Sequence, residues 1–197
     1  MTAKIDLTID EDDLKYLDIK KEDYREIKII NKTISNSIFD NVSFIDSSSD
    51  NTFFEKIVFN NCDLSNFKFI DSNLREVEFN NCKLLGTYFN NSHLTKVTIN
   101  NSLAKYLNII DSKIKELSIN SSNLEESNFY NTELNKITFN DVNFKKTEFY
   151  KTKLTGIDFS NCNIESIKIT PDSLKGIKVN TVQALDLVKL LDIEIVE

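Results

Sequence analysis

An apolar residue recurs at every fifth position over most of this chain. From Ile29 to Ile169 the positions numbered with a final 4 or 9 hold Ile, Leu, Phe or Ala, except Ser49, and twelve of the 14 phenylalanines fall on them. A period of five matches neither an α-helix nor a flat strand. It requires a chain that turns a corner about every five residues and sends one large side chain inward each time, which is typical of a solenoid.

A second period sets the size of one coil. Pairs of Asn, Asp or Ser follow every second apolar position, from Asp40-Asn41 to Ser160-Asn161, so the pattern repeats every 20 residues. Four five-residue segments therefore form one coil, and residues twenty apart stack in a column. Asn and Asp suit the corners because they tolerate unusual backbone angles, and stacked Asn side chains can form hydrogen-bonded ladders.

Segments such as Cys62-Asp63-Leu64-Ser65-Asn66 place a small residue two positions before a central Leu or Phe. In this respect residues 27–170 resemble the pentapeptide-repeat family. The resemblance implies an all-β solenoid, a right-handed quadrilateral β-helix with a short C-terminal α-helix. With about 4.8 Å between coils, about seven coils would form a rod on the order of 35 Å long.

We expect one domain over residues 1–197. Residues 1–28 would form an N-terminal cap or irregular coil with a short helix, residues 29–170 the β-helix, and residues 171–197 a C-terminal helix and dimerisation tail.

The C-terminal tail indicates self-association. Residues 181–191 have a helical pattern with Asn180 or Thr181 as N-cap, and so much of this helix is apolar that the last coil and a second copy would both be needed to cover it. The tail is similar to that of the quinolone-resistance (Qnr) group within the family, at Gly176, Val179, Gln183, Ala184, Leu187, Leu191 and Ile193. The resemblance implies a homodimer joined tip to tip. Its expected interface consists of Leu185, Leu187, Val188, Leu190, Leu191 and Ile193.

Two coils depart from the pattern. Ser49 places a hydroxyl at a core position, and Ala104 is undersized there, with Leu103 and Tyr106 at outward positions nearby. Members of the Qnr group from Gram-negative bacteria project loops from about these places. This chain has no extra residues at either point, so we expect irregular coils at Ser49 and Ala104 without loops. The alternative is that the coil tolerates a poor repeat at these two points.

The charge pattern limits the partners. The net charge is −7, but residues 31–170 hold 17 acidic and 15 basic residues, so the coils are close to neutral. A protein that binds nucleic acid directly would present a basic face, so we expect no direct nucleic-acid binding. No apolar run approaches the length of a membrane span, and the N-terminus has no secretory pattern. We therefore expect no membrane association and a cytoplasmic location.

The chain offers little catalytic chemistry. His93 is the only histidine and lies at an outward position, and no nucleophile, phosphate-loop or metal-binding motif is present. We expect no enzyme activity, no metal and no cofactor. Cys62, Cys82 and Cys162 lack the Cys-x-x-Cys spacing of zinc sites and fit best as small wall residues, although Cys62 and Cys82 are close enough in the repeat for a disulfide.

The resemblance to the Qnr group implies a DNA-mimicking protein that binds type II DNA topoisomerase (gyrase or topoisomerase IV) and protects it from quinolones. Two rods joined end to end would be roughly 70 Å long, about the length of 20 base pairs. Acidic residues on the walls would stand in for phosphates, namely Asp63, Asp71, Glu76, Glu78, Asp111 and Glu126. The alternative is a structural or scaffolding protein-binding module without topoisomerase activity.

One outward column is rich in apolar residues. Ile30, Ile70, Ile110, Tyr130 and Tyr150 share it, interrupted by Asp50 and Asn90. The sequence supports two interpretations equally, an interaction surface or residues that pack along a ladder of strands.

Overall fold

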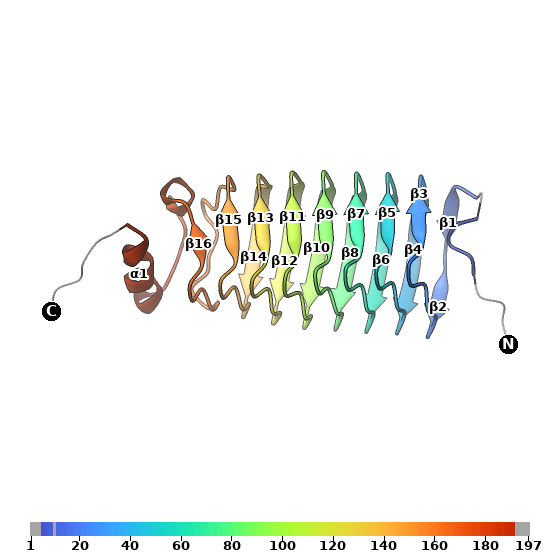
Figure 1. The fold of residues 1–197 in the computed structure, drawn as a ribbon, viewed down its shortest axis with the longest axis horizontal. Helices are drawn as coiled ribbons and strands as arrows, with labels where there is room; N and C mark the ends of the chain where they lie inside the picture. Colours follow the sequence, from blue (N-terminus) through green and yellow to red (C-terminus); the bar gives the residue numbers. More distant parts are fainter. Residues whose placement is uncertain (1–4, 10, 192–197) are drawn as a thin grey trace.

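The chain forms a four-sided rod of stacked parallel coils, closed at its C-terminal end by a helix (Figure 1). The computed structural model describes residues 5–9 and 11–191. Long strands that cross a corner are β4 (Thr33–Asp40), β6 (Phe53–Asn60), β8 (Asn73–Asn80), β10 (His93–Asn100), β12 (Lys113–Asn120) and β14 (Glu133–Asn140). Short strands are β1 (Asp13–Lys15), β2 (Asp18–Lys20), β3 (Lys28–Ile30), β5 (Ser48–Asp50), β7 (Lys68–Ile70), β9 (Tyr88–Asn90), β11 (Asn108–Ile110), β13 (Asn128–Tyr130), β15 (Glu148–Tyr150) and β16 (Lys168–Ile169).

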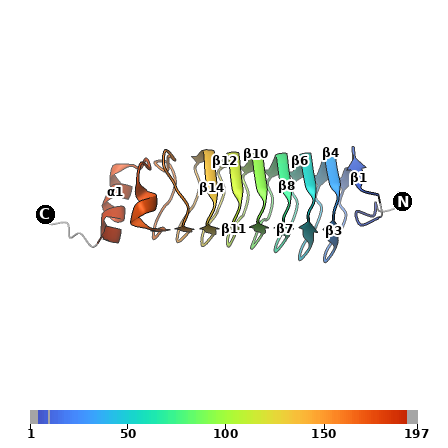
Figure 2. The ribbon, with the colours of Figure 1, turned by 90° about the horizontal axis from the view of Figure 1, so that it is seen from above.

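The strands build two parallel sheets of eight strands each, which run the length of the rod on different sides (Figures 1 and 2). The first sheet joins β1 and β2 to β4 and continues to β14, and the second runs from β3 to β16. Strand partners are twenty residues apart, as for Phe79 and Ile99. The predicted β-solenoid is therefore confirmed, with eight coils in the second sheet instead of seven.

Each coil has four walls of five residues. In residues 41–60 we call 41–45, 46–50, 51–55 and 56–60 walls 1, 2, 3 and 4, and the same names apply every twenty residues. The first residue of a wall is a corner in the left-handed region, as shown by Asn41 (φ 55°), Asp46 (56°), Asn51 (46°) and Lys56 (54°). The second and fourth residues point inward, and the third and fifth point outward.

The left-handed corners explain the abundance of asparagine. A side chain with a Cβ atom disfavours this conformation by about 1–2 kcal/mol per residue, and Asn, Asp and Gly tolerate it best. Most corners of walls 1, 2 and 3 carry one of these three residues. At the corner Gly86, an added Cβ would also lie 2.7 Å from the side-chain oxygen of Asn66. A corner therefore opens every wall, as the five-residue period predicted.

The core contains the predicted five-residue grid and a second set of inward residues. The fourth residue of every wall from Ile29 to Ile169 is buried, except the half-buried Leu134. Phenylalanines stack in this column, with 5.1 Å between the ring centroids of Phe59 and Phe79. The second residues of the walls are also buried and mostly small. The prediction of one inward residue per five was therefore incomplete.

The small second residues satisfy main-chain carbonyls inside the rod. The hydroxyl of Thr87 donates to the carbonyl of Leu64 at 2.8 Å, and Thr132 does the same to Ile109 at 3.1 Å. The thiol of Cys62 donates to Phe39 at 3.3 Å. Because buried polar groups need partners, Ser, Thr and Cys can exchange at these positions. All three cysteines are free and buried.

The two weak core positions do not produce irregular coils. Ser49 is fully buried, with 3.3 Å between its hydroxyl and that of Ser72, and a large second residue, Phe67, packs in the next coil. In the wall that follows Ala104, the second residue is Leu107, which is also fully buried. The expectation of irregular coils is wrong, because the strands keep their register at both points without loops, in agreement with the alternative that the coil tolerates a poor repeat.

The N-terminal end differs from the expectation of a helical cap. Within residues 5–9 and 11–30 the chain contains no helix, and β1, β2 and β3 continue the coils with Leu14, Ile19 and Tyr24 inward. The hydroxyl of Tyr24 donates to the carbonyl of Ile5 at 2.7 Å, and burial raises its pKa to about 12. The residues before β1 thus close the first coil.

The C-terminal helix closes the other end. After η1 (Pro171–Leu174), α1 (Thr181–Val188) continues into η2 (Lys189–Leu191). Asn180 is the N-cap and forms a capping box with Gln183. The amide of Gln183 also donates to the carbonyls of Phe159 and Cys162, at 2.9 and 2.7 Å. The helix is thereby fixed to the last coil by two side-chain hydrogen bonds to main-chain oxygens, of which that of Phe159 also accepts from the main-chain N–H of Cys162.

Along β14 the main-chain hydrogen bonds to the next coil are missing among the described residues. Residues 153–160 do not pair with β14 and bond instead to the following segment, with Gly156 donating to the carbonyl of Gly176 at 2.8 Å. This gap in the hydrogen bonding leaves Leu134 and Ile137 half-buried, whereas their equivalents in the preceding coils are buried. Here the ring planes of Phe139 and Phe159 are inclined by 46°, whereas those of Phe59 and Phe79 are nearly parallel.

The stacked core predicts the effect of removing one ring. Phe79 is fully buried against Phe59 and Phe69, so Phe79→Ala should lower the free energy of unfolding by about 3–5 kcal/mol. Chemical denaturation monitored by circular dichroism measures this loss. An unchanged transition would show that the inward register is wrong.

The cysteines give a second test of the interior. Contact with Cys62 and burial raise the pKa of the Cys82 thiol, burial raises that of Cys162, and the contact with Cys82 lowers that of Cys62. Because all three side chains are buried, a water-soluble thiol reagent should leave the folded protein unmodified and modify all three cysteines in urea. Rapid reaction of the folded protein would contradict the burial, and modification of a single thiol in urea without reductant would indicate a disulfide.

Candidate partner-binding surfaces

The six acidic residues proposed as phosphate mimics are distributed around the rod. Asp63 lies on wall 1 and Glu78 on wall 4. The others occupy corners: Glu126 opens wall 2, Asp71 and Asp111 open wall 3, and Glu76 opens wall 4. The structure therefore does not bring these six side chains together on one face. Asp71 and Asp111 are the only pair among them that shares a column.

Three of these carboxylates are neutralised by a cation one coil away. Glu76 lies 3.3 Å from Lys96, Asp63 lies 3.4 Å from Lys83, and Glu126 lies 3.5 Å from Lys146. The partners are twenty residues apart in each case, so the same stacking that builds the core also pairs the surface charges. Exposed pairs of this kind contribute little to stability, but they remove the isolated negative charge that a phosphate mimic requires.

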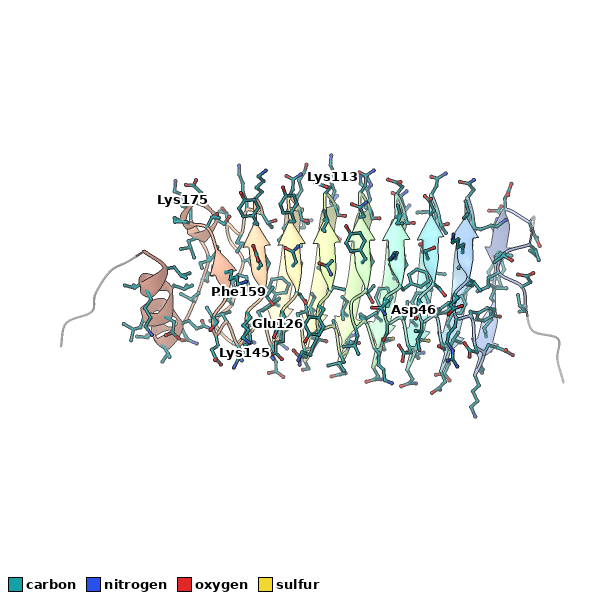
Figure 3. The ribbon with its side chains drawn as sticks, viewed as in Figure 1. Asp46, Lys113, Glu126, Lys145, Phe159 and Lys175 are labelled. Atoms are coloured by element: carbon teal, nitrogen blue, oxygen red, sulfur yellow. The ribbon has the colours of Figure 1, made fainter. Side chains whose placement is uncertain are left out.

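Vertical ion pairs recur along the rod. At the corner that opens wall 4, Glu116 pairs with Lys136 at 3.2 Å, in a column whose sign alternates from Lys56 to Lys136. On wall 1, Lys105 lies 2.9 Å from Glu125, and this contact raises the pKa of the lysine and lowers that of the glutamate. Figure 3 shows the charged side chains projecting from the rod, with Lys113 and Lys145 among those labelled. The pairs could have been found by comparing residues twenty positions apart.

The other three proposed acids have neutral partners. Asp71 accepts a hydrogen bond from Asn91, and Asp111 accepts one from Asn131 at 2.6 Å. Glu78 lies 3.4 Å from the amide nitrogen of Asn80. A neutral amide leaves the carboxylate charge in place, so these three sites keep their negative charge toward solvent.

Wall 4 carries a ladder of asparagines. Asn80 donates to Asn60 at 3.1 Å, Asn100 to Asn80 at 2.8 Å, and Asn120 to Asn100 at 2.9 Å. The predicted side-chain ladder is thus present on the outside of the rod. The side-chain amides of this ladder already form hydrogen bonds with one another, so they are less available to a ligand.

Wall 2 carries the apolar outward column. Ile30 and Tyr150 are exposed, while Ile70, Ile110 and Tyr130 are half-buried. Tyr130 and Tyr150 stack with 5.5 Å between ring centroids, so part of the column packs along the ladder, as one of the two interpretations expected. The exposed remainder leaves an apolar strip on this wall.

The C-terminal tip exposes apolar side chains on one side of α1. Val182 is 70% exposed, Leu185 48% and Leu190 41%. Val188 is half-buried. Leu187 is buried against its own chain, so its assignment to the dimer interface is wrong, because it faces the last coil. The side chain of Leu191 and all of Ile193 lie outside the described residues.

Within the described part of the chain, no group of three or more His, Cys, Asp and Glu side chains could hold a metal ion. His93 is exposed on wall 3. Among the helices that the structure describes, none is long and apolar enough to cross a membrane. The candidate binding surfaces of the described residues are therefore the four walls and the C-terminal tip, which differ in composition.

The comparisons with known proteins agree with this architecture. A trypsin-treated QnrB1, described as a plasmid-mediated fluoroquinolone resistance protein, has a TM-score of 0.53 and 15% identity, over 94% of this chain and 100% of that one. HetL from the cyanobacterium Nostoc sp. strain PCC 7120, described as involved in heterocyst differentiation regulation, has a TM-score of 0.28 and 11% identity, over 85% and 91% of the two chains. At these identities the likeness to QnrB1 concerns the fold alone.

No curated protein sequence matches the chain. The family description "Pentapeptide repeat region" matches residues 32–109 and 112–187, which include nearly all the coils described above. Together with the five-residue walls and the left-handed corners, this match shows that the chain belongs to the pentapeptide-repeat family.

Proposed function

We propose that this protein binds a type II DNA topoisomerase, gyrase or topoisomerase IV, and relieves its inhibition by quinolones. The observation that carries the proposal is a slender rod closed by a C-terminal helix, which aligns over 94% of this chain with QnrB1, a fluoroquinolone resistance protein. A rod of eight coils is about 38 Å long at about 4.8 Å per coil. A pair joined at the tips would be comparable in length to about 20 base pairs of DNA.

Shape contributes more to this mimicry than charge. Three of the six acids proposed as phosphate substitutes are paired with lysines of the adjacent coil, and a paired carboxylate attracts a basic surface only weakly. Asp71, Glu78 and Asp111 keep their charge and are the ones expected to contribute. The rigid β-helix supplies a preformed rod, so binding requires little ordering of the chain.

The tip of the rod supports a homodimer. The exposed apolar side chains of Val182 and Leu185 on α1 and of Leu190 on η2 are not covered by the chain's own last coil. A second copy related by a twofold axis would cover both patches with the same residues. The dimer would thereby extend the rod in the direction of its axis.

The dimer is tested with two substitutions on the same helix. Leu185→Glu, on the exposed side, should convert the protein into a monomer that melts normally, because its side chain does not contribute to the core of one chain. Leu187→Glu is the control, since it places a charge against the last coil and should lower the melting temperature. Sedimentation and thermal melting distinguish the two effects. A stable monomer for the unaltered protein at micromolar concentration would exclude the dimer.

The topoisomerase interaction is tested by gyrase supercoiling in ciprofloxacin. The unaltered protein should restore supercoiling at micromolar concentration, and the effect should decrease with salt, because exposed charges are screened beyond about 8–10 Å at physiological ionic strength. Reversing the two neighbouring acids one at a time separates a free charge from a paired one. Glu78→Lys should weaken the effect, whereas Glu76→Lys, at a carboxylate already paired with Lys96, should weaken it less. Circular dichroism of both variants controls for folding. Absence of binding by the unaltered protein to either topoisomerase at low salt would refute the proposal.

A second candidate is a scaffolding module that binds a protein other than a topoisomerase. The vertical ion pairs favour it, because they make the walls less like the uniformly negative surface of DNA. Normal supercoiling inhibition by ciprofloxacin in the presence of the protein, with the fold intact, would favour this candidate.

A further inference from the structure

Wall 2 differs from the other walls in its side-chain chemistry. Over the five coils from Asp46 to Asn131, its outward residues and its two bordering corners include five carboxylates and one lysine. The carboxylates are Asp46, Asp50, Asp71, Asp111 and Glu126. The same positions hold Tyr88, Tyr106 and Tyr130, together with seven asparagines. Tyr is enriched at protein interfaces while Lys is depleted, and binding surfaces of antibodies favour Tyr and Asn.

Three of the four carboxylates at the corners that border this wall keep their charge. Asp46 accepts a hydrogen bond from Asn66 at 2.9 Å, in the same manner as Asp71 and Asp111 accept from Asn91 and Asn131. Among the described residues no cation forms an ion pair with any of these three. The fourth, Glu126, pairs with Lys146, as Glu76 and Glu116 pair with lysines at the corner that opens wall 4. The unpaired negative charge at the borders of wall 2 is therefore that of Asp46, Asp71 and Asp111.

The surface of wall 2 is also uneven, with one groove and one raised pair of tyrosine rings. Gly86 carries no side chain in a corner column that otherwise projects outward, and a groove lies there, lined by Asp46, Asn66, Lys68, Ile70, Gly86 and Tyr88. Further along, Tyr130 and Tyr150 form a stacked ledge, with the ammonium group of Lys151 5.6 Å from the first ring centroid and 5.7 Å from the second. The rings are held by the strands beneath them, so this surface is rigid before any partner arrives.

We propose that wall 2, from Asp46 to Tyr150, is the docking surface for a protein segment rich in arginine and lysine. The last coil of this range adds Lys146, which pairs with Glu126, and is bordered by Lys151, so the negative charge of the wall lies toward Asp46. Arginine fits the wall because its guanidinium group pairs with carboxylates and packs on tyrosine rings. Lysines of this chain already lie over Tyr106, Tyr130 and Tyr150, so the ring of Tyr88 is the one we expect an arginine to contact. The apolar stems of the partner's basic side chains would cover Ile70 and Ile110. Wall 4 is also without lysines between Asp40 and Asp141 in its outward third and fifth positions, but it has no aromatic residue there.

This inference does not require that the partner is a topoisomerase. The direct test uses short random peptides displayed on phage and selected against the immobilised full-length protein. Peptides that bind should be enriched in Arg and Lys, and their binding should decrease with salt. Selection of peptides without basic residues, or of none, would overturn the proposal.

Two double variants locate the site of the selected peptides. Asp71→Asn with Asp111→Asn removes two charges at the border of wall 2, and the fold tolerates asparagine in this column, since Asn51 donates to Asn31 at 2.8 Å. Tyr130→Ser with Tyr150→Ser removes the ledge. Each should weaken peptide binding by about tenfold or more, the usual effect of losing central interface residues.

The matched control is Asp40→Asn with Asp141→Asn, which changes the net charge equally but lies on wall 4 and the corner between walls 4 and 1. It should leave peptide binding unchanged. Equal loss with the control would indicate attraction to net charge alone and would overturn the assignment to wall 2. A decrease in the protein's own sedimentation coefficient with both wall 2 variants would assign the wall to self-association instead and would also overturn it.

Discussion

Hydrogen bonding between coils twenty residues apart is the interaction on which the rest of this structure depends. Main-chain groups of one coil donate to the next, as Asn41 does to Asn60 and Asn61 to Asn80, at 2.9 Å in both cases. To keep these bonds on all four sides, the chain must turn at every fifth residue. Each turn requires a left-handed residue, and this requirement sets the frequency of asparagine and the direction in which every side chain points.

The same stacking decides the chemistry of the surface. Residues of one column lie about 4.8 Å apart, so a charge is always adjacent to the residue twenty positions away. Where that residue is a lysine, as for Glu76 and Lys96, the carboxylate is neutralised. Where it is an asparagine, as for Asp111 and Asn131, the charge persists. A nearly neutral rod can therefore have one wall bordered by isolated negative charges, which net charge alone does not show.

The two ends of the solenoid must be covered, because a stack of parallel strands exposes unpaired main-chain groups at both ends. At the C-terminal end the capping box of Asn180 and the two hydrogen bonds of Gln183 place α1 across the last coil. Leu187 is buried in this contact. The helix covers the last coil with one side only, and Val182 and Leu185 remain exposed on it.

The amino-acid sequence by itself determined the solenoid, its four walls and the twenty-residue coil. These features depend on residues close in the repeat, and a period of five matches neither a helix nor a flat strand. Only the tertiary structure decided that Asn180 and not Thr181 is the N-cap of α1, and that the coils stay regular at Ser49 and Ala104, because that requires knowing that second residues also point inward. Only the structure showed which acids retain their charge and, within the residues it describes, that β14 forms no main-chain hydrogen bonds to the next coil. Both depend on contacts between whole coils, which are decided by the geometry of stacking and not by the local pattern.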